Sequence, residues 1–345
     1  MGTDYENTIS FKELYTGLVK SRRNVMWKDS VAGYSINILK NTYKLRQSLL
    51  RGTYKIDPYQ IFKIHEPKER EIMATRIKDR QFQRSLCDNI LYPQITRSFI
   101  HDNCACQRGK GVDFALDRMD ANLHRYFRKH GPDGWVLQCD VRHYFAETRH
   151  SDAKAAIEKR VIDKMASFRA GEIVDSFGDY KGIGLGSQVS QITELAVLDD
   201  LDHFIKERLR VKHYMRYMDD FILIHESNEF LEDCLAEILA KMDTLGLELN
   251  KKTHIYPLGH GLKFLKWRFI LTDTGKVIRM MSKKSISKER RKLRKLKSKL
   301  DNGLITIQDV RNNYQSWVAN ASRGNTRALI LRMNTYYQEL FGEVP

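Results

Sequence analysis

The sequence predicts an α+β fold built on a small antiparallel sheet, and three observations support this class. Apolar residues recur at helical spacing through several long stretches. Short apolar runs suited to strands stand between these stretches, as at residues 59–64 and 135–145. Two further apolar runs flank a polar centre within residues 213–225, which is typical of a β-hairpin. Helices interspersed with short hairpins favour an antiparallel sheet over a parallel one.

In chain order, the first half begins with a basic, amphipathic helical segment over residues 1–55. The run at 59–64 and a second short run near Ile72 form a predicted hairpin, followed by a helix over 79–92. A loop rich in glycine and basic residues comes next, and helical spacing resumes from Phe114 to Phe127.

The second half begins with the apolar strand 135–145, which follows a turn of sequence GPDG. The later elements are a helix over 152–168, a long helix from about 192, the hairpin, a helix over 229–244, and strands near 255 and over 262–271. Ten basic residues and one acidic residue fall within 283–299, where leucines mark one face of a helix, and helical spacing continues from Ile305.

Composition narrows the class of function. The chain has 345 residues, with 59 Lys and Arg against 43 Asp and Glu, and its formal net charge is +16. Such a balance indicates a polyanionic partner, meaning nucleic acid or an anionic surface. The sequence shows neither a membrane span nor a signal peptide, so we expect a cytoplasmic protein without a membrane partner. Five scattered cysteines predict reduced thiols rather than a disulfide framework.

Three aspartates lie where strand hydrophobicity should exclude charge. Asp140 interrupts the apolar run at 135–145, and Asp219 with Asp220 occupies the centre of the predicted hairpin. A buried carboxylate is costly unless it is paired or binds a cation. Three carboxylates brought together by one sheet suit Mg²⁺ held with substrate phosphates, as in a two-metal phosphoryl-transfer site. The alternative reading of an Asp pair as a simple turn former is less consistent with the order of these motifs.

The order of these motifs resembles the reverse transcriptases, and more narrowly the bacterial group that includes group II intron and diversity-generating retroelement enzymes. The similarity extends from about Tyr54 to the C-terminus. Eight blocks occur in the family's order: PKEREI at 67–72, KDRQFQRSL at 78–86, CACQRGKG at 104–111, CDVRHYF at 139–145, GIGLGSQVSQ at 182–191, RYMDDFILI at 216–224, LGLELNKKT at 245–253 and LKFLKWRF at 262–269.

The resemblance implies a right-hand polymerase that copies RNA into DNA. Its expected domains are fingers with a basic helical N-terminal segment at 1–130, a palm with some inserted finger helices at 131–272, and a helical, basic thumb at 273–345. Asp140, Asp219 and Asp220 match the catalytic, metal-binding carboxylates, with the backbone of Val141 as a further ligand. The implied cofactor is a pair of Mg²⁺ ions, with Mn²⁺ as a substitute.

Other matches imply contacts with the incoming deoxynucleotide. Tyr144 corresponds to the bulky side chain that excludes a ribose 2′-hydroxyl. Lys68 and Arg70 correspond to residues that grip the triphosphate, with Lys63 as a weaker candidate, and Lys252 to a proton donor for pyrophosphate. Leu185, Gly186 and Gln191 belong to the loop beside the nascent base pair. The expected contacts with template and primer are Arg108, Lys110, Lys283, Lys284, Lys288, Arg291, Arg294 and Lys295.

The loop LGSQVSQ at 185–191 distinguishes groups within the family. Group II intron and retron-like enzymes usually show QGxxxSP here, whereas this chain is similar to the IGxxxSQ form of diversity-generating retroelement enzymes. That likeness implies error-prone copying opposite template adenine. The alternative is an antiphage-defence or retron-like enzyme with its own non-coding RNA. Expected partners are the template or non-coding RNA, the cDNA or primer, deoxynucleotides, and an accessory protein or second copy, in a bacterial or phage-encoded system.

Overall fold

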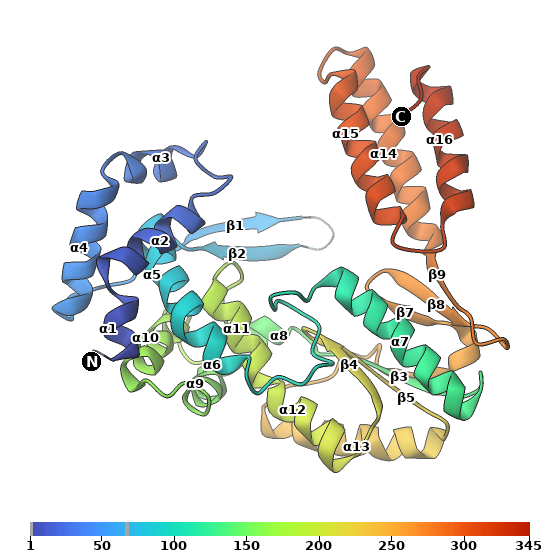
Figure 1. Ribbon diagram of the computed structural model, residues 1–345, viewed down its shortest axis with the longest axis horizontal. Coiled ribbons are helices and arrows are strands. Elements are labelled where there is room, and N and C mark those ends of the chain that lie inside the picture. Colours follow the sequence, from blue (N-terminus) through green and yellow to red (C-terminus); the bar gives the residue numbers. More distant parts are fainter. Residues whose placement is uncertain (1–2, 66–68) are drawn as a thin grey trace. The chain divides into compact units, whose positions relative to one another are not determined.

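The computed structural model describes residues 3–65 and 69–345, which form two compact units. The first unit comprises Met1–Arg108, Cys139–Phe221 and Asp233–Thr253. The second comprises Gly109–Gln138, Ile222–Glu232 and His254–Pro345. Helices and short antiparallel strands alternate along the chain, as the sequence predicts (Figure 1).

The N-terminal part of the first unit is helical up to a two-stranded hairpin. Its elements are α1 Asp4–Thr8, α2 Phe11–Ser21, α3 Asp29–Ile36, α4 Ile38–Leu50, β1 Gln60–Ile64, β2 Arg70–Ala74, α5 Ile77–Leu86, a π-helix Cys87–Leu91 and α6 Tyr92–Ile95. Helix α2 packs closely on α5, because a side chain at Gly17 would meet the carbonyl oxygen of Gln81 at 2.6 Å. Gln81 is buried and donates to the carbonyl oxygen of Leu14 at 3.1 Å. The predicted N-terminal segment is therefore part of the core of this unit.

The remaining elements of the first unit come later in the chain. They are α8 Tyr144–Glu147, α9 His150–Glu158, α10 Lys164–Asp175, α11 Gln188–Val197, α12 Asp199–His203, a π-helix Phe204–Arg208, β4 His213–Tyr217 and most of α13 Asn228–Thr244. Helix α11 is buried along nearly its whole length. It therefore forms a fixed base for residues of α8 that hydrogen-bond to it.

The central sheet has four strands in the order β4-β5-β3-β6, with β3 at Trp135–Asp140, β5 at Asp220–His225 and β6 at His254–Pro257. Strand β3 pairs antiparallel with β6, Trp135 opposite Pro257. On β5, the four residues from Phe221 to Ile224 are buried and form a continuous apolar run. Asp140 is the last residue of β3 and Asp220 the first of β5, so both lie at strand ends.

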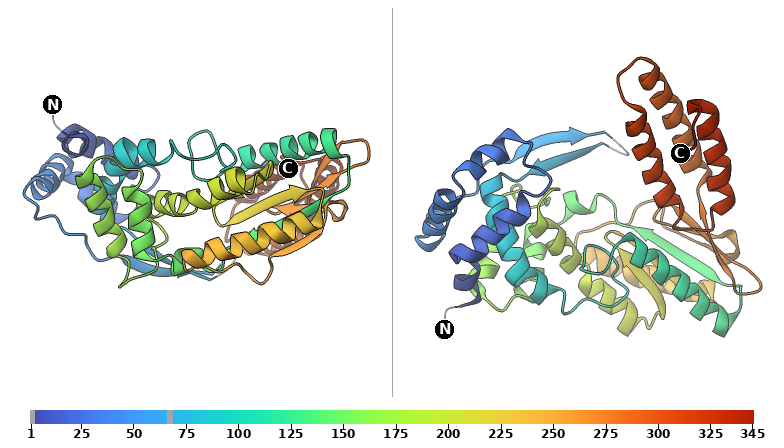
Figure 2. Two further views of the ribbon diagram at one scale, coloured as in Figure 1. Left: turned by 90° about the horizontal axis from the view of Figure 1, so that it is seen from below. Right: turned by 45° about the horizontal axis from the view of Figure 1, so that its top comes forward.

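The second unit also contains helix α7 Val112–His130, a 3₁₀-helix Leu258–His260, a three-stranded antiparallel sheet and three C-terminal helices. These are β7 Leu262–Phe264, β8 Trp267–Leu271, β9 Val277–Met281, α14 Lys283–Asp301, α15 Ile307–Ala321 and α16 Arg327–Phe341. The three helices lie side by side in both Figure 1 and Figure 2 and share a core of their own. The rings of Tyr314 and Tyr337 stack at its centre, 4.7 Å apart. The helical prediction for the last part of the chain is confirmed.

Several elements differ from the sequence prediction, and the strand expected over 262–271 is the two strands β7 and β8. The strand expected over 135–145 ends at Asp140, because His143 takes a left-handed conformation (φ 48°) and starts α8. The helix expected over 152–168 is two helices, since the Asp163 carboxylate caps a new one by accepting from the backbone of Met165 and Ala166. Strand β9 was not predicted from the sequence. The hairpin at 213–225 and the basic helix are confirmed.

Candidate active site

The three aspartates of the sequence analysis lie at the ends of neighbouring strands. Asp140 is the last residue of β3, whereas Asp219 and Asp220 lie at the turn into β5, the strand beside β3. The backbone N–H of Val141 donates to the carbonyl oxygen of Asp219 over 3.2 Å. All three aspartates are half-buried. The fold therefore places the backbones of Asp140 and Asp219 side by side.

These carboxylates have the donor chemistry of a magnesium site. Oxygen ligands are what Mg²⁺ prefers in proteins, and the three residues supply only oxygens. Within residues 3–65 and 69–345, no group of three or more His, Cys, Asp or Glu side chains is gathered closely enough to hold a metal ion. Like charges that lack a shared cation repel one another. The donor set thus fits divalent cations, and the two-ion site remains a prediction.

A buried ion pair supports the turn that carries Asp219 and Asp220. Arg216 and Asp202 are both fully buried, and the guanidinium donates to the carboxylate at 2.6 and 2.7 Å. Burial by itself would lower the pKa of Arg216, but the charge of Asp202 raises that pKa above its usual value. Arg216 also donates to the carbonyl oxygen of Met218 at 2.9 Å. Because Met218 is in a left-handed conformation (φ 57°), this contact fixes the turn immediately before Asp219.

Tyr144 lies four residues after Asp140, at the start of α8, and is almost completely buried. Its hydroxyl donates to the backbone carbonyl oxygen of Glu194 on α11 at 2.6 Å. Burial, followed by the nearby charge of Glu194, raises the pKa of Tyr144 well above its usual value. The ring is therefore held by a neutral hydroxyl bonded to a buried helix. Its predicted role beneath the incoming sugar is not tested by these contacts.

The sequence analysis did not identify Glu194, which is the buried carboxyl group behind Tyr144. Its Oε2 lies 3.0 Å from the hydroxyl oxygen of Thr148, and its Oε1 has no hydrogen-bond partner among the described residues. Burial raises the pKa of Glu194 to about 8, hydrogen bonds from Tyr144 and Thr148 lower it, and the negative charge of Asp219 adds a smaller increase. A signal was present in the sequence, because an acidic residue interrupts the apolar helical pattern ITELAV at 192–197.

The Gly/Ser loop lies against the hairpin of the first unit. The backbone N–H of Met73 on β2 donates to the carbonyl oxygen of Leu185 at 3.0 Å. Gly186 is exposed with φ 122°, and a side chain there would come within 3.2 Å of the Met73 carbonyl oxygen. Gln191 is exposed on the first turns of α11. The structure thus places Leu185 and Gly186 beside β2, with Gln191 farther along.

Lys252 lies in a segment that is attached to the strand of Asp140. The backbone N–H of Asn250 donates to the carbonyl oxygen of Asp140 at 2.7 Å. The Asn250 side chain in turn accepts from the backbone N–H of Lys252 at 3.1 Å. The ammonium-bearing side chain of Lys252 is exposed. Lys252 is therefore two residues from a direct contact with the backbone of Asp140.

The residues predicted to hold the triphosphate are only partly described. Lys68 lies outside the described residues. Arg70 is exposed at the start of β2, opposite Ile64. Lys63 is ion-paired with Glu69 at 2.9 Å. Both partners are largely exposed, so this pair leaves the Lys63 charge accessible to a phosphate.

The predicted nucleic-acid contacts are all at the surface. The Arg108 guanidinium stacks on Tyr92, 4.9 Å from the ring centroid, and in the second unit the Lys110 ammonium lies 5.5 Å from the Phe114 ring. Every predicted cation of α14 is exposed: Lys283, Lys284, Lys288, Arg291, Arg294 and Lys295. Leu293 of the same helix is fully buried in the three-helix core. Helix α14 thus has one apolar face and one strongly basic face.

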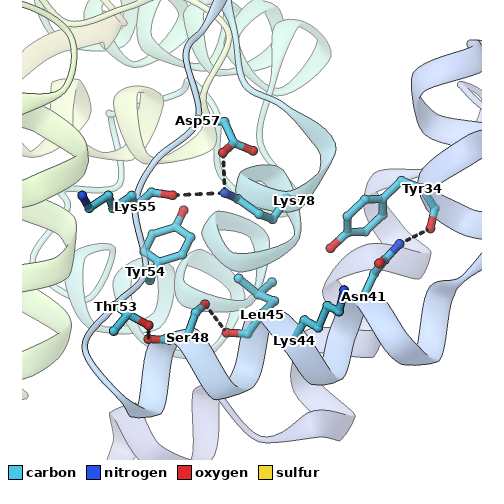
Figure 3. Close-up of a pocket in the computed structure, with 10 residues that line it drawn as sticks. All are labelled: Tyr34, Asn41, Lys44, Leu45, Ser48, Thr53, Tyr54, Lys55, Asp57 and Lys78. Carbon is cyan, nitrogen blue, oxygen red and sulfur yellow. Dashed lines mark hydrogen bonds and ion pairs between the residues drawn. The ribbon is translucent and has the colours of Figure 1, made fainter.

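A cavity of about 380 Å³ opens between α4 and the segment that leads to β1. Its lining contains three lysines, Lys44, Lys55 and Lys78, and one aspartate, Asp57. Figure 3 shows the Lys78 ammonium between Asp57, to which it donates at 2.5 Å, and the carbonyl oxygen of Lys55 at 3.1 Å. Lys44 and Lys55 are exposed. The excess of ammonium groups gives this cavity a positive lining.

Comparison with known proteins assigns the chain to a family. Residues 63–269 match the family described as reverse transcriptase (RNA-dependent DNA polymerase). The chain therefore belongs to the reverse transcriptases. No curated protein matches this sequence. No helix in the described part of the chain is long and apolar enough to cross a membrane.

Similar solved structures include two Candida telomerases. The apo telomerase of Candida tropicalis, truncated from its C-terminal domain, has a TM-score of 0.50 at 13% identity, over 70% of this chain and 60% of that one. Candida albicans telomerase in complex with a TWJ fragment of telomeric RNA has a TM-score of 0.48 at 12% identity, over 66% and 46%. This chain thus spans at most 60% of either structure. Together with the family match, the first likeness confirms the predicted α+β right-hand polymerase fold.

Proposed function

We propose that the chain is an RNA-directed DNA polymerase that copies a dedicated structured RNA into cDNA. The observation that carries the proposal is the bond from Val141 to Asp219, which joins the ends of two strands that both bear predicted catalytic carboxylates. The family match over residues 63–269 agrees with it. In this proposal residues 1–130 act as fingers, 131–272 as palm and 273–345 as thumb.

Asp140, Asp219, Asp220 and the carbonyl oxygen of Val141 would hold two Mg²⁺ ions, which Mn²⁺ could replace. When bound, such ions activate the attacking hydroxyl and stabilise the charge of the leaving pyrophosphate. The chain's own contribution is to keep these ligands in place. Arg216 does so by fixing the carbonyl group of Met218 next to Asp219.

The incoming deoxynucleotide would be selected and oriented by side chains around these carboxylates. Tyr144 would lie beneath the sugar, where its bulk excludes a 2′-hydroxyl. Arg70, together with Lys68, would bind the triphosphate, since guanidinium groups pair well with phosphate oxygens. Lys252 would donate a proton to the departing pyrophosphate, and its attachment near Asp140 through Asn250 supports this role.

Copying in this proposal is error-prone, as in a diversity-generating retroelement. Leu185 and Gly186 would lie against the nascent base pair, with Gln191 nearby. An apolar Leu185 offers no hydrogen bond to that pair, whereas the glutamine usual in related enzymes does. Loss of one such bond relaxes the selection of the correct base. We expect the largest effect opposite template adenine.

Surface cations would bind the nucleic-acid strands. The exposed basic face of α14, with Lys283, Lys284, Lys288, Arg291, Arg294 and Lys295, suits the phosphate backbone of a template–primer duplex. Arg108 and Lys110 would add contacts at the loop after α6. The cavity lined by Lys44 and Lys55 would bind phosphates of the template or non-coding RNA.

The test is to purify the protein with the RNA it carries from cells, add Mg²⁺ and deoxynucleotides, and sequence the cDNA. Asp219→Ala is the inactive variant, and Asp243→Asn, which changes an exposed carboxylate on α13, is the matched control. We expect cDNA from the wild type and the control but not from Asp219→Ala.

The error spectrum then separates the biological roles. Errors concentrated at template adenines would support the diversity-generating role. Accurate or repetitive cDNA from one bound RNA would indicate instead an antiphage-defence or retron-like enzyme. Synthesis that does not depend on Asp219 would overturn the proposed polymerase site.

A further inference from the structure

Three side chains in the first unit form a closed hydrogen-bonded set behind the predicted sugar site. They are Tyr144 at the start of α8, Thr148 immediately after it, and Glu194 on α11. All three are buried, and Glu194 has no exposed surface. Tyr144 donates to the backbone carbonyl oxygen of Glu194 at 2.6 Å. The Tyr144 hydroxyl is thus bonded to the backbone of α11, and Thr148 links the backbone of Tyr144 to the Glu194 side chain.

A count of protons favours a neutral Glu194. The Thr148 hydroxyl oxygen lies 2.9 Å from the carbonyl oxygen of Tyr144 and 3.0 Å from Oε2 of Glu194. A hydroxyl has one proton to donate, and a backbone carbonyl can only accept. If Thr148 donates to Tyr144, its bond to Glu194 forms only when the carboxyl group donates. Both contacts are satisfied together when Glu194 carries a proton.

The surroundings of Glu194 favour the same neutral state. Within the described part of the chain, Glu194 takes part in no ion pair, and its Oε1 has no hydrogen-bond partner. An ionised carboxylate without a partner is expensive to bury. Burial raises the pKa of Glu194 to about 8, although hydrogen bonds from Tyr144 and Thr148 act in the opposite direction. Arg216, the nearby cation, is bound to Asp202 instead.

We propose that Glu194 is a positioning residue that, as a neutral carboxyl group, holds Tyr144 in place through Thr148 and so sets the selection of deoxyribonucleotides over ribonucleotides. The inference rests on the proposed function, in which Tyr144 excludes the 2′-hydroxyl. The neutral group can serve here because it both donates to Thr148 and adds no charge beside Asp219. A fixed ring excludes a small additional hydroxyl, whereas a ring free to shift accommodates it.

The experiment measures kcat/KM for a deoxynucleotide and for the matching ribonucleotide with the purified full chain on one template and primer. Glu194→Gln keeps the shape and a donor for Thr148, while Glu194→Ala removes both. Thr148→Val removes the central hydroxyl, and Thr148→Ser is its matched control. We expect Glu194→Gln and Thr148→Ser to stay within about twofold of the wild-type ratio. Glu194→Ala and Thr148→Val should lose up to about tenfold in that ratio, as expected for one buried hydrogen bond.

The outcomes separate this inference from the polymerase assignment. Deoxynucleotide incorporation that requires Asp219 but shows an unchanged ratio in Glu194→Ala and Thr148→Val would overturn the role of Glu194 alone. A ratio lost equally in Glu194→Gln and Glu194→Ala would show that the ionised carboxylate is what matters, which contradicts the neutral state. If Glu194→Ala fails to fold, the comparison of Thr148→Val with Thr148→Ser decides the question.

Discussion

Glu194 and Asp202 are both fully buried acidic residues on one helical run, α11–α12, yet their surroundings differ. Asp202 accepts two hydrogen bonds from Arg216 and a third from the hydroxyl of Tyr214 at 2.6 Å. Glu194 lies among hydroxyl and carbonyl groups, with no cation bound to it among the described residues. Burial raises the pKa of Asp202, but the charge and hydrogen bonds of Arg216 oppose that shift. Asp202 therefore has a cation that balances its charge, whereas Glu194 has none among the described residues.

The surroundings of the two acids differ because each acid has a different role in the proposed site. The Asp202–Arg216 pair supports the turn before Asp219, where a rigid and strongly bonded base keeps a left-handed residue in place. Glu194 lies close enough to Asp219 for the two charges to repel. A second ionised acid there would compete with the predicted metal ligands for cations. A neutral carboxyl group provides the hydrogen bond without that competition.

The largest expected effect comes from breaking the ion pair. Arg216→Ala leaves Asp202 buried without its cation, which should lower the free energy of unfolding by about 3–5 kcal/mol. Denaturant unfolding monitored by circular dichroism measures this change. Arg208→Ala, an exposed residue of the neighbouring π-helix, is the control and should stay within about 0.5 kcal/mol of the wild type. Equal stability of both variants would refute a supporting role for the pair.

A smaller loss of stability is expected at Thr148, the partner of the neutral Glu194. Thr148→Val removes the hydroxyl between Tyr144 and Glu194 while keeping the volume, and leaves a buried carboxyl proton without an acceptor. We expect the free energy of unfolding to fall by roughly 1–3 kcal/mol. Thr148→Ser, which keeps the hydroxyl, should lose less. If both variants unfolded at the same denaturant concentration as the wild type, the hydroxyl would not be part of a stabilising network.

Much of the fold could be predicted because the sequence patterns are local. Acidic residues inside or between apolar runs identified Asp140 and the Asp219–Asp220 pair, and the structure places the backbones of Asp140 and Asp219 side by side. The spacing of leucines and basic residues over 283–299 likewise predicted a helix with one exposed, charged face. These features depend on residues close in the sequence, where periodicity is informative.

Other features depend on backbone conformations and distant contacts that sequence periodicity does not reveal. Strand β3 ends early because His143 adopts a left-handed conformation. The sequence pattern around this histidine does not mark a turn. The helical pattern at 192–197 does not reveal that Glu194 is buried beside Thr148, because the two residues are 46 positions apart in sequence. A buried acid can be recognised only once the surrounding elements are placed.

The pH dependence of stability gives the finest test of the comparison. Glu194 has a pKa of about 8 in the folded chain, against an ordinary value of 4.5. Between these values the folded state holds a proton that the unfolded state has released, so the contribution of Glu194 to stability is full below pH 4.5 and is lost as the pH rises to about 8. Glu194→Gln cannot titrate. The wild-type free energy of unfolding, minus that of Glu194→Gln, should therefore fall with pH by at most roughly 1.4 kcal/mol per unit in this window. A flat difference for Glu194→Gln would mean that Glu194 is ionised in the folded chain.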